Sequence, residues 1–576
     1  MKAPSRSTSS GVIDRAAHAV TAAADEYVQS YFAYRPEQAL LNGAPYGDQA
    51  RVTDNTPAAL AAWRAREDSL VTRVKEIDAD ILIGRPEWVT YGVLRETLEG
   101  AIGTRICRHE LWDVNSSPAG WQSVFTEVAD RQPVGTDSLR GLAVSRASAL
   151  ARYVDNEIAN LRSGVAQGYT APRVIVTAVI SQLDGLLKAK PESSAFAAAA
   201  ERDTTPAFRR DLTHVITSEL NPAIRRYRDY LAKTYLSAAR TSIGVSALPN
   251  GAACYDASVR LSSTLEIPPD SVYRIGLAQT ARIQQAMHEI AERDFGMSDV
   301  PALLHKIRTD PMYAFTTRQA IRDTAQAAIN RARAAVPKWF GILPKAGVVI
   351  RDYPEFRQIA GAPGEEMPPG PDGSPAVFLI NTYDPTHKNR AGLESLAFHE
   401  AIPGHVLQTG IAVELRNAHP LTKYFFKSGF GEGWALYAEG LADEMGLYSS
   451  PLSRLGLLTS QAFRAARLVV DPGIHTKGWS REQAMDFMRT HTTEDERAIQ
   501  GEVDRYIAWP GQATSYMLGQ MEILRLRQEA KDALGPRFDI RQFHDRVLED
   551  GNVTLPLLRA KIERWITTVT EQPGER

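Results

Sequence analysis

Apolar residues recur every three or four positions along most of this chain of 576 residues, and this spacing limits the folds that are open to it. A period near that of the α-helix places apolar side chains on one face, which can then be buried against neighbouring helices. The clearest examples are residues 136–163, 209–236, 271–295 and 317–335, where alanine, leucine, arginine and glutamate accompany the apolar positions. The pattern therefore predicts a mainly α-helical protein.

Before residue 393 the helical pattern is replaced by short apolar runs. Residues 347–351 (GVVIR) and 376–381 (AVFLIN) are short apolar or β-branched runs bounded by turn residues, which is typical of strands. Residues 361–374 between them are rich in glycine and proline, so we expect an irregular loop there. Helical patterns return at residue 393 and end with a helix over residues 555–568. The sequence thus predicts one small sheet in a helical protein.

We expect three parts along the chain. Residues 1–10 are polar and are predicted to form a disordered tail. Residues 11–300 are predicted to form a helical scaffold half, and residues 301–576 the half that carries the chemistry, although the two halves can make one continuous structural domain. A hydrophobic content of 44% is enough for the large core that either arrangement needs.

The charge balance argues against polyanionic partners. The chain carries 66 lysines and arginines against 68 aspartates and glutamates, for a formal net charge of -2. Such a chain has no electrostatic footprint for nucleic acid or for an anionic membrane. No apolar run approaches the roughly 18 residues of a membrane-spanning helix, so no span is predicted.

Two features bear on the compartment in which the protein works. The N-terminal sequence MKAPSRSTSSGVIDRAAHAV lacks the continuous apolar core of a secretory signal, so we expect a cytoplasmic protein unless a signal was removed. The two cysteines, Cys107 and Cys254, are too few and too far apart in the sequence for a disulfide framework or for a cysteine-based zinc site. We expect both to be ordinary thiols.

One motif points to metal chemistry. Residues 393–408 read LESLAFHEAIPGHVLQ and bring His399, Glu400 and His405 close together in the sequence. In the common H-E-x-x-H motif, two histidines one helical turn apart bind a zinc ion, and the glutamate acts as general base on the zinc-bound water. The same residue types here predict the same chemistry.

The spacing of this motif requires a break in the helix. His405 lies six rather than four positions after His399, about 240° round a regular helix instead of about 40°. Pro403 cannot supply the N–H that would bond to the His399 carbonyl, and Gly404 admits backbone conformations closed to other residues. We therefore predict that the helix breaks at this pair and that the break returns His405 to the metal side.

A second segment offers the third ligand that a zinc site requires. Residues 430–445 (FGEGWALYAEGLADEM) have a helical pattern. Glu432 would complete a site of two histidines and one carboxylate, with the fourth position open for water. Glu439 lies two turns further on, about 20° round the helix, where it can accept a hydrogen bond from a ligand imidazole and orient it. This donor set predicts one zinc ion.

Four segments together resemble a bacterial family of unknown function whose members are taken to be zinc peptidases with the signature H-E-x-x-P-G-H. The segments are HEAIPGH, GEGWALYAE and residues 469–484 and 505–519, and the resemblance extends over most of the chain, including NTYDP at 381–385. It implies a large helical, zincin-like metallopeptidase fold with a small β-sheet beside the metal helix and a deep cleft. It also implies that residues 301–576 form the zincin-like catalytic half.

More distant similarities imply roles for single residues. GEGWALYAE is similar to the N-E-G-F-A helix of the gluzincin aminopeptidases, whose first glutamate binds zinc, as Glu432 would here. Arg505-Tyr506 is similar to an Arg-Tyr pair of the angiotensin-converting-enzyme and carboxypeptidase Taq relatives, where the tyrosine hydroxyl stabilises the oxyanion. This sequence departs from both groups by two extra residues between its histidines, so the choice among carboxypeptidase, aminopeptidase and endopeptidase stays open.

These residues together predict hydrolysis of peptide bonds in short peptides, by an exopeptidase or oligopeptidase. Glu400 would take a proton from the metal-bound water and pass it to the leaving amine. Tyr506 is the preferred donor to the tetrahedral oxyanion, with Tyr516 as the alternative. His475 is a candidate second donor to the oxyanion or to a substrate carbonyl, or else a loop histidine with a structural hydrogen bond.

Further residues are candidates for contacts with the substrate. Asn381 ends a predicted strand that either exposes an edge for pairing with an extended peptide or is plain core. Arg464, Arg467 and Arg505 could each bind a substrate carboxylate through two hydrogen bonds, or each be solvated or salt-bridged. If one of them binds a C-terminus, the enzyme would be a carboxypeptidase. Tyr516 completes the set of substrate-binding candidates.

Three other functions fit part of the pattern. A metal-dependent amide or ester hydrolase of a small metabolite would use the same residues. A non-haem iron oxygenase also uses two histidines and one carboxylate, but it has no need of the base that Glu400 supplies. A catalytically inactive binding protein on the same scaffold would not need Glu400 either. The sequence does not indicate an oligomeric state.

Overall fold

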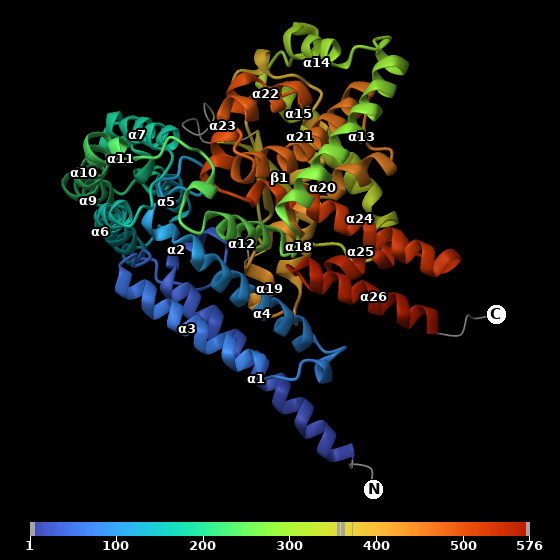
Figure 1. Ribbon diagram of the computed structural model, residues 1–576, viewed down its shortest axis with the longest axis horizontal. Helices are drawn as coiled ribbons and strands as arrows, with labels where there is room; N and C mark the ends of the chain where they lie inside the picture. The colour runs from blue at the N-terminus through green and yellow to red at the C-terminus, as the bar shows by residue number, and fades with distance from the viewer. Residues whose placement is uncertain (1–5, 354–357, 359–362, 371–372, 572–576) are drawn as a thin grey trace. The chain divides into compact units, whose positions relative to one another are not determined.

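The structure of the protein is a computed structural model that describes residues 6–353, 358, 363–370 and 373–571. Figure 1 shows that helices make up almost all of its regular structure and that one small sheet accompanies them. The mainly α-helical fold with a small sheet is as predicted, whereas the deep cleft stays a prediction. Among the described helices, none is both long and apolar enough to span a membrane.

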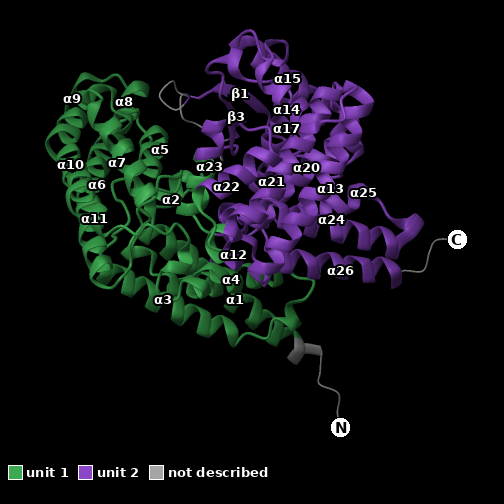
Figure 2. Cartoon of the chain, turned by 45° about the horizontal axis from the view of Figure 1, so that its top comes forward, with its two compact units in different colours: residues 1–257, 474–481, 501–510 green, residues 258–473, 482–500, 511–576 purple. Residues whose placement is uncertain are grey.

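The chain forms two compact units, which Figure 2 shows in green and purple. Unit 1 comprises residues 1–257, 474–481 and 501–510, and unit 2 comprises residues 258–473, 482–500 and 511–576. The boundary therefore lies earlier than the predicted residue 300, and two short later segments belong to unit 1. Helices α12 (Gly251–Ser263), α21 (Pro451–Thr476) and α23 (Glu496–Ala508) begin in one unit and end in the other, and α22 (Arg481–His491) has its first residue, Arg481, in unit 1 and the rest in unit 2.

The remaining helices divide between the two units. Unit 1 contains α1 (Arg6–Tyr34), α2 (Pro36–Leu41), α3 (Pro57–Lys75), α4 (Pro86–Thr104), α5 (Trp121–Arg131), α6 (Asp137–Ala166), α7 (Arg173–Lys188), α8 (Ala199–Arg202), α9 (Pro206–Val215), α10 (Asn221–Tyr230) and α11 (Leu236–Ala238). Unit 2 contains α13 (Pro269–Phe295), α14 (Val300–Thr309), α15 (Arg318–Ala335), α17 (Leu393–Glu400), α18 (His405–Glu414), α19 (Pro420–Tyr424), α20 (Ser428–Glu444), α22 (Arg481–His491), α24 (Ser515–Leu534), α25 (Ile540–Leu548) and α26 (Leu555–Glu571). α1 begins at Arg6, so residues 6–10 are helical rather than disordered as predicted, and residues 1–5 lie outside the described residues.

Helix starts carry signals that are readable in the sequence. The hydroxyls of Thr56, Thr136 and Thr317 accept hydrogen bonds from backbone N–H groups in the first turns of α3, α6 and α15, at 3.3, 3.2 and 3.0 Å. Each bond satisfies a donor that a helix leaves without an intrahelical partner at its N-terminus. α13 ends at Phe295 and is followed by Gly296, whose φ of 64° is a left-handed conformation that favours glycine. Local sequence thus explains where these helices begin and end.

Three strands form the sheet in the order β1–β3–β2, with β1 at Val348–Asp352, β2 at Gly364–Met367 and β3 at Ala376–Ile380. β1 runs parallel to β3, and β2 runs antiparallel to it. β2 lies inside the segment predicted to be an irregular loop, so that prediction is wrong for this strand. β3 is the central strand and is buried along its whole length. Of the two alternatives for residues 376–381, β3 is therefore a core strand, and the edges of the sheet belong to β1 and β2.

The central strand fixes the position of the helix that carries the first histidine. Phe378 and Ile380 of β3 belong to one buried cluster with Ile329 of α15 and with Ala397 and Phe398 of α17. Burying an apolar side chain of this size stabilises the fold by about 1.5–3 kcal/mol. α17 therefore packs on a continuous core, and the residues that follow Phe398 start from a well-supported helix.

Cys107 and Cys254 form a disulfide bond across 147 positions of the sequence. Both are 1% exposed, and both belong to unit 1. The expectation of two ordinary thiols is therefore wrong. The two cysteines are far apart in the sequence, which gave no reason to expect a bond between them. The fold of unit 1 brings the end of α4 and the start of α12 together.

We expect peptide mapping of the non-reduced protein to recover the peptides of Cys107 and Cys254 linked to each other. Removing a disulfide that closes a long loop costs on the order of 2–5 kcal/mol, so Cys107→Ser and Cys254→Ser should each lower the midpoint of urea unfolding. The double variant should lose no more than either single variant, because each already breaks the bond. Two titratable thiols in freshly purified, non-reduced protein would contradict this expectation.

A buried carboxyl group in unit 1 links stability to pH. Glu157 of α6 is 7% exposed and accepts a hydrogen bond from the Asn55 side chain at 2.5 Å. Burial raises the pKa of Glu157 to about 8, and the Asp113 carboxylate adds to the shift. The folded protein therefore holds this proton more tightly than the unfolded chain does, where the pKa is near 4.5.

Because the folded pKa of Glu157 lies above the unfolded one, this stabilisation is complete below about pH 4.5 and is lost as the pH rises towards 8. Glu157→Gln keeps an oxygen for Asn55 and has no charge to bury. Its stability relative to wild type should rise by about 1.4 kcal/mol per pH unit across that interval. Urea unfolding of both proteins at several pH values measures the difference, and a difference that does not change with pH would refute the prediction.

Candidate metal centre

The helix that carries the first histidine ends where the sequence predicts. α17 ends at Glu400, and the next residue, Ala401, has φ -104° and ψ -101°, outside the helical region. α18 begins at the second histidine, His405. The predicted break between the two histidines is confirmed.

The break requires a glycine because two backbone segments nearly touch there. A Cβ atom on Gly404 would lie 1.8 Å from the His399 carbonyl oxygen and 2.4 Å from that of Phe398, far inside van der Waals contact. The same turn is held from α20, where the Trp434 indole Nε1 donates a hydrogen bond to the Pro403 carbonyl at 3.0 Å. Sequence reasoning missed this role of Trp434, although the residue stands in the E-G-W motif.

The break brings three potential ligands together. The Nε2 atoms of His399 and His405 lie 3.6 and 3.4 Å from the same carboxylate oxygen of Glu432. The two imidazole rings are 5.0 Å apart at an angle of 89°, and the three donor atoms lie within 4.8 Å of one another. Ligands about 2.0–2.1 Å from a tetrahedral zinc ion are separated by about 3.3 Å. These side chains therefore fit a single zinc ion.

The charges of the site favour a bound cation. Burial alone would raise the pKa of Glu432, but the neighbouring His399 and His405 imidazoles hold it well below its usual value, so this carboxylate is ionised. Burial alone would lower the pKa of His399, yet the Glu432 and Glu439 carboxylates raise it. Carboxylates that attract protons to the imidazoles also attract a metal cation, so the site is arranged for positive charge.

The His399 imidazole is oriented from its other side. Its Nδ1 lies 2.8 Å from one carboxylate oxygen of Glu439, and the Ser395 hydroxyl donates to the other oxygen at 2.6 Å. Glu439 is fully buried, and the Tyr448 hydroxyl donates to its backbone carbonyl at 3.2 Å. Such a contact fixes the tautomer of a ligand histidine, which is the role predicted for Glu439. Ser395 was missed, although it lies one turn before His399 on α17.

Glu400, the predicted general base, is half-buried at the end of α17. Burial raises its pKa to about 8, which His405 and Arg464 oppose and the Glu432 and Glu366 carboxylates reinforce. A carboxyl group with a pKa near neutral pH can both accept and release a proton during turnover. The environment of Glu400 therefore suits acid–base chemistry.

Glycines allow the helix of the third ligand to approach its neighbour closely. α20 packs along α24. A Cβ atom on Gly433 would lie 2.5 Å from the Gly519 backbone, and one on Gly519 would lie 1.8 Å from the Gly429 carbonyl oxygen. Gly433 and Gly519 are thus needed where the two backbones meet. This close contact sets the position of Glu432.

His475 has a structural role, which contradicts the prediction of an oxyanion donor. It is fully buried inside α21 rather than in a loop. Its Nδ1 accepts a hydrogen bond from the Val245 backbone N–H at 3.0 Å, and its Nε2 donates to the Tyr506 carbonyl at 3.0 Å. Burial lowers its pKa to about 3. Both ring nitrogens of this neutral histidine are occupied within unit 1.

Tyr506 and Arg505 are also structural. Tyr506 is fully buried, and its hydroxyl donates to the Glu502 carboxylate at 2.7 Å. Arg505 donates to the same carboxylate through Nε and Nη2, at 3.2 and 2.9 Å. A hydroxyl that is buried and bound to a carboxylate is not available to an oxyanion, so the preferred donor and the Arg505 substrate contact are corrected. Both residues lie in unit 1, whereas the three candidate ligands lie in unit 2.

The two other candidates for contact with the substrate, Asn381 and Tyr516, differ in their surroundings. Asn381 is 5% exposed, its Nδ2 donates to the Gln358 carbonyl at 2.8 Å, and its Oδ1 accepts from the Tyr383 N–H at 3.1 Å. It shapes the turn after β3, so its predicted substrate contact is corrected. Tyr516 is half-buried on α24 in the same unit as the ligands, with the Arg467 guanidinium 4.4 Å from its ring centre. Its role as the alternative oxyanion donor stays a prediction.

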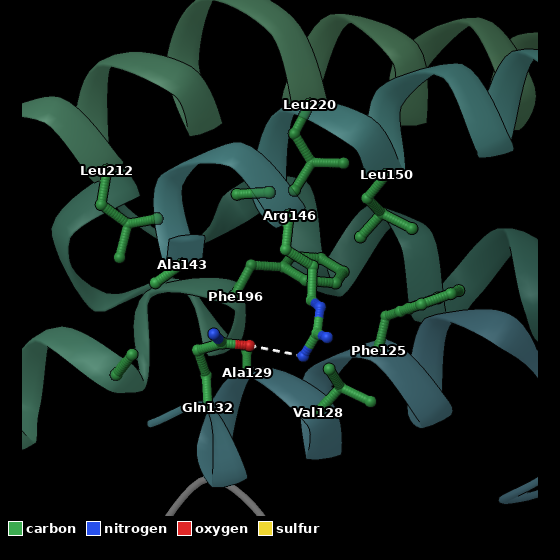
Figure 3. Close-up of a pocket in the computed structure, with 12 residues that line it drawn as sticks. Phe125, Val128, Ala129, Gln132, Ala143, Arg146, Leu150, Phe196, Leu212 and Leu220 are labelled. Atoms are coloured by element: carbon green, nitrogen blue, oxygen red, sulfur yellow. Dashed lines mark hydrogen bonds between the residues drawn. The ribbon is translucent and has the colours of Figure 1, made fainter. Parts of the chain in front are cut away.

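A pocket in unit 1 offers no chemistry. Figure 3 shows a pocket lined almost entirely by apolar side chains, many of them from α5 and α6. Its one charged lining residue, Arg146, is 5% exposed and donates to the Gln132 side chain and to the carbonyls of Arg51 and Asp48. Because this guanidinium is already bound within the protein, the pocket presents no acid, base or metal ligand.

The close approach at residue 404 yields a test of the site. Gly404→Ala should displace the two histidines and weaken zinc binding on the order of 10–100-fold, as the loss of ligand orientation does elsewhere. Gly440→Ala on α20 is the matched control, because nothing lies within 4 Å of the added Cβ. Competition with a chromogenic chelator measures both affinities. Equal zinc affinities for Gly404→Ala and wild type would exclude the proposed geometry.

Comparison with known proteins identifies a family but no activity. A crystal structure of a candidate lipoprotein from Colwellia psychrerythraea is similar to this chain, with a TM-score of 0.89 and 27% sequence identity over 97% of this chain and 99% of that one. A candidate lipoprotein of unknown function from Shewanella oneidensis has a TM-score of 0.72 and 19% identity over 93% and 98% of the two chains. No curated protein matches the chain. A profile described as a bacterial protein of unknown function matches residues 36–562, so the chain belongs to the bacterial family DUF885.

Proposed function

We propose that this protein is a zinc-dependent hydrolase that cleaves amide bonds in short peptides. The observation that carries the proposal is the convergence of His399, His405 and Glu432 donor atoms within 4.8 Å. Glu400 follows the first of these ligands directly in the chain. Two histidines and one carboxylate leave one position of a tetrahedral ion open for water, which is typical of catalytic rather than structural zinc sites.

Each residue of the site has a definite task in this reaction. A bound zinc ion would supply a Lewis acid that lowers the pKa of a water ligand towards about 7. Glu400 accepts a proton from the attacking water and passes it to the leaving amine. Tyr516 donates a hydrogen bond to the oxygen of the attacked carbonyl, in place of Tyr506. Glu439 keeps the His399 imidazole in the orientation that binding requires.

An extended peptide suits the surroundings of the site. β2 is an edge strand of the sheet and contacts both α17 and α18. The Thr409 hydroxyl of α18 donates to the Glu366 carboxylate of β2 at 2.6 Å, which ties the strand to the helix of the second histidine. A peptide that adds a strand at this edge would pass the histidine-bearing helices. The small-amide alternative makes no use of such an edge.

The protein is proposed to work outside the cytoplasm, contrary to the expectation from its N-terminal sequence. Disulfides form and persist in oxidising compartments and are rare in the cytosol, and Cys107 and Cys254 form one. Two structurally similar proteins are described as candidate lipoproteins, which agrees with an exported protein.

The general base gives the sharpest test of the proposed function. Glu400→Gln removes the base and keeps all three ligands, so turnover of short peptides should fall by about 10²–10⁴-fold while one zinc ion per chain stays bound. Glu432→Gln should instead lose zinc and activity together. Elemental analysis and peptide turnover measure both. The hydrolase proposal fails if the zinc-loaded wild type cleaves neither peptides nor small amides, and iron as the resident metal would favour an oxygenase.

A further inference from the structure

The three arginines considered as receptors for a substrate carboxylate differ in the structure. Arg505 is bound to a carboxylate of its own helix in unit 1. Arg467 is 5% exposed, and its guanidinium lies 4.4 Å from each of two aromatic ring centres, one of them that of Tyr516. Arg464, on α21 within unit 2, is the one whose guanidinium lies beside the candidate metal centre.

Arg464 is anchored through one side of its guanidinium group. Its Nη1 donates to the Ser460 hydroxyl, one helical turn away, at 2.7 Å. Its Nη2 lies 3.9 Å from a Glu439 carboxylate oxygen, a distance too long for a hydrogen bond. Its buried Nε has no hydrogen-bond partner among the described residues. The Nε–Nη2 edge, through which arginine binds a carboxylate by two parallel bonds, is therefore the side left unengaged.

Glu439 does not take up this edge. One of its carboxylate oxygens is bonded to His399 Nδ1 at 2.8 Å, and the other receives the Ser395 hydroxyl at 2.6 Å. No other carboxylate of the described residues lies within ion-pair distance of Arg464. A buried guanidinium N–H without an acceptor lowers the stability of the folded protein. A substrate carboxylate that accepted a hydrogen bond from it would remove this cost.

The position of Arg464 suits contact with a substrate near the reacting bond. Its Nη2 lies 3.9 Å from a carboxylate oxygen of Glu439, and the same oxygen lies 2.8 Å from Nδ1 of His399, so the guanidinium is one residue removed from a candidate metal ligand. It also lies 6.0 Å from the ring centre of Tyr516, the candidate oxyanion donor. A group held here would be next to the residues of the candidate metal centre.

We propose that the Nε–Nη2 edge of Arg464 binds a carboxylate of the substrate close to the scissile bond. This inference rests on the proposed function and narrows it to peptides that carry a negative charge at that place. The charge comes either from the C-terminus, which would make the enzyme a carboxypeptidase, or from an aspartate or glutamate side chain. Both sources present the same planar acceptor pair to the guanidinium.

The first experiment compares four peptides on the zinc-loaded wild type. They end in alanine or glutamate, each as the free acid or as the C-terminal amide. If the C-terminus is bound, amidation should lower kcat/KM about 10- to 100-fold, the effect of losing hydrogen bonds to a charged group. If the side chain is bound, glutamate should exceed alanine by a similar factor in both forms. Equal rates for all four peptides would overturn the inference and leave the proposed function standing.

The second experiment replaces the arginine. Arg464→Lys keeps the charge but loses the two-donor edge, so the preference for the charged peptide should fall close to one while zinc affinity is unchanged. Arg454→Lys is the matched control, because Arg454 lies on the same helix, is 46% exposed and pairs with Asp443; it should keep the preference. Loss of zinc from Arg464→Lys would assign Arg464 to the support of Glu439 and overturn the inference.

A binding measurement separates the two proposals. If the zinc-loaded wild type cleaves no peptide, the proposed function fails on its own. Calorimetry with zinc-loaded Glu400→Gln then still tests Arg464, by comparing an acetylated dipeptide that ends in glutamate with its diamide. Tighter binding of the acid, by about tenfold or more, supports a carboxylate receptor. Equal binding rejects it.

Discussion

The candidate site depends on one backbone contact, between Gly404 and the carbonyl group of His399. An unbroken helix would point His405 about 240° away from His399, and no ion could then be shared. The chain folds back within four residues only because residue 404 has no Cβ, which would lie 1.8 Å from that carbonyl oxygen. The turn is then held by the Trp434 hydrogen bond to Pro403, from the same helix that supplies the third ligand. Ligand geometry and helix packing are therefore set together.

The charges around His399 show how the fold supports such a site. Glu432 and Glu439 lie on opposite sides of the ring, at Nε2 and Nδ1. Burying carboxylates costs several kcal/mol each unless they are paired, and here the pairing consists of imidazoles, the Ser395 hydroxyl and the approach of Arg464. The arrangement has more negative than positive fixed charge at the ligand face, since both histidines are neutral when they bind a metal. A divalent cation would balance it.

The sequence predicted those features that depend on local spacing. The long helices, strands β1 and β3, the break before His405 and the convergence of His399, His405 and Glu432 all follow from periodicity, proline and glycine chemistry, or the preferred ligands of zinc. Features that depend on distant partners were missed. β2 (GEEM) has no β-branched residue and exists through its pairing with β3. The structural role of His475, which the sequence left open beside a catalytic one, depends on Val245, 230 positions away. The Cys107–Cys254 bond was missed because its two residues are also far apart in the sequence.

The most direct test of the account is the position of the metal in a crystal of the zinc-loaded protein, read from anomalous scattering at the zinc edge. The account predicts one peak per chain, about 2.0–2.2 Å from the Nε2 atoms of His399 and His405 and from the carboxylate of Glu432. A protein that binds zinc in solution but shows its peak at other residues, with these three side chains directed apart, would contradict it.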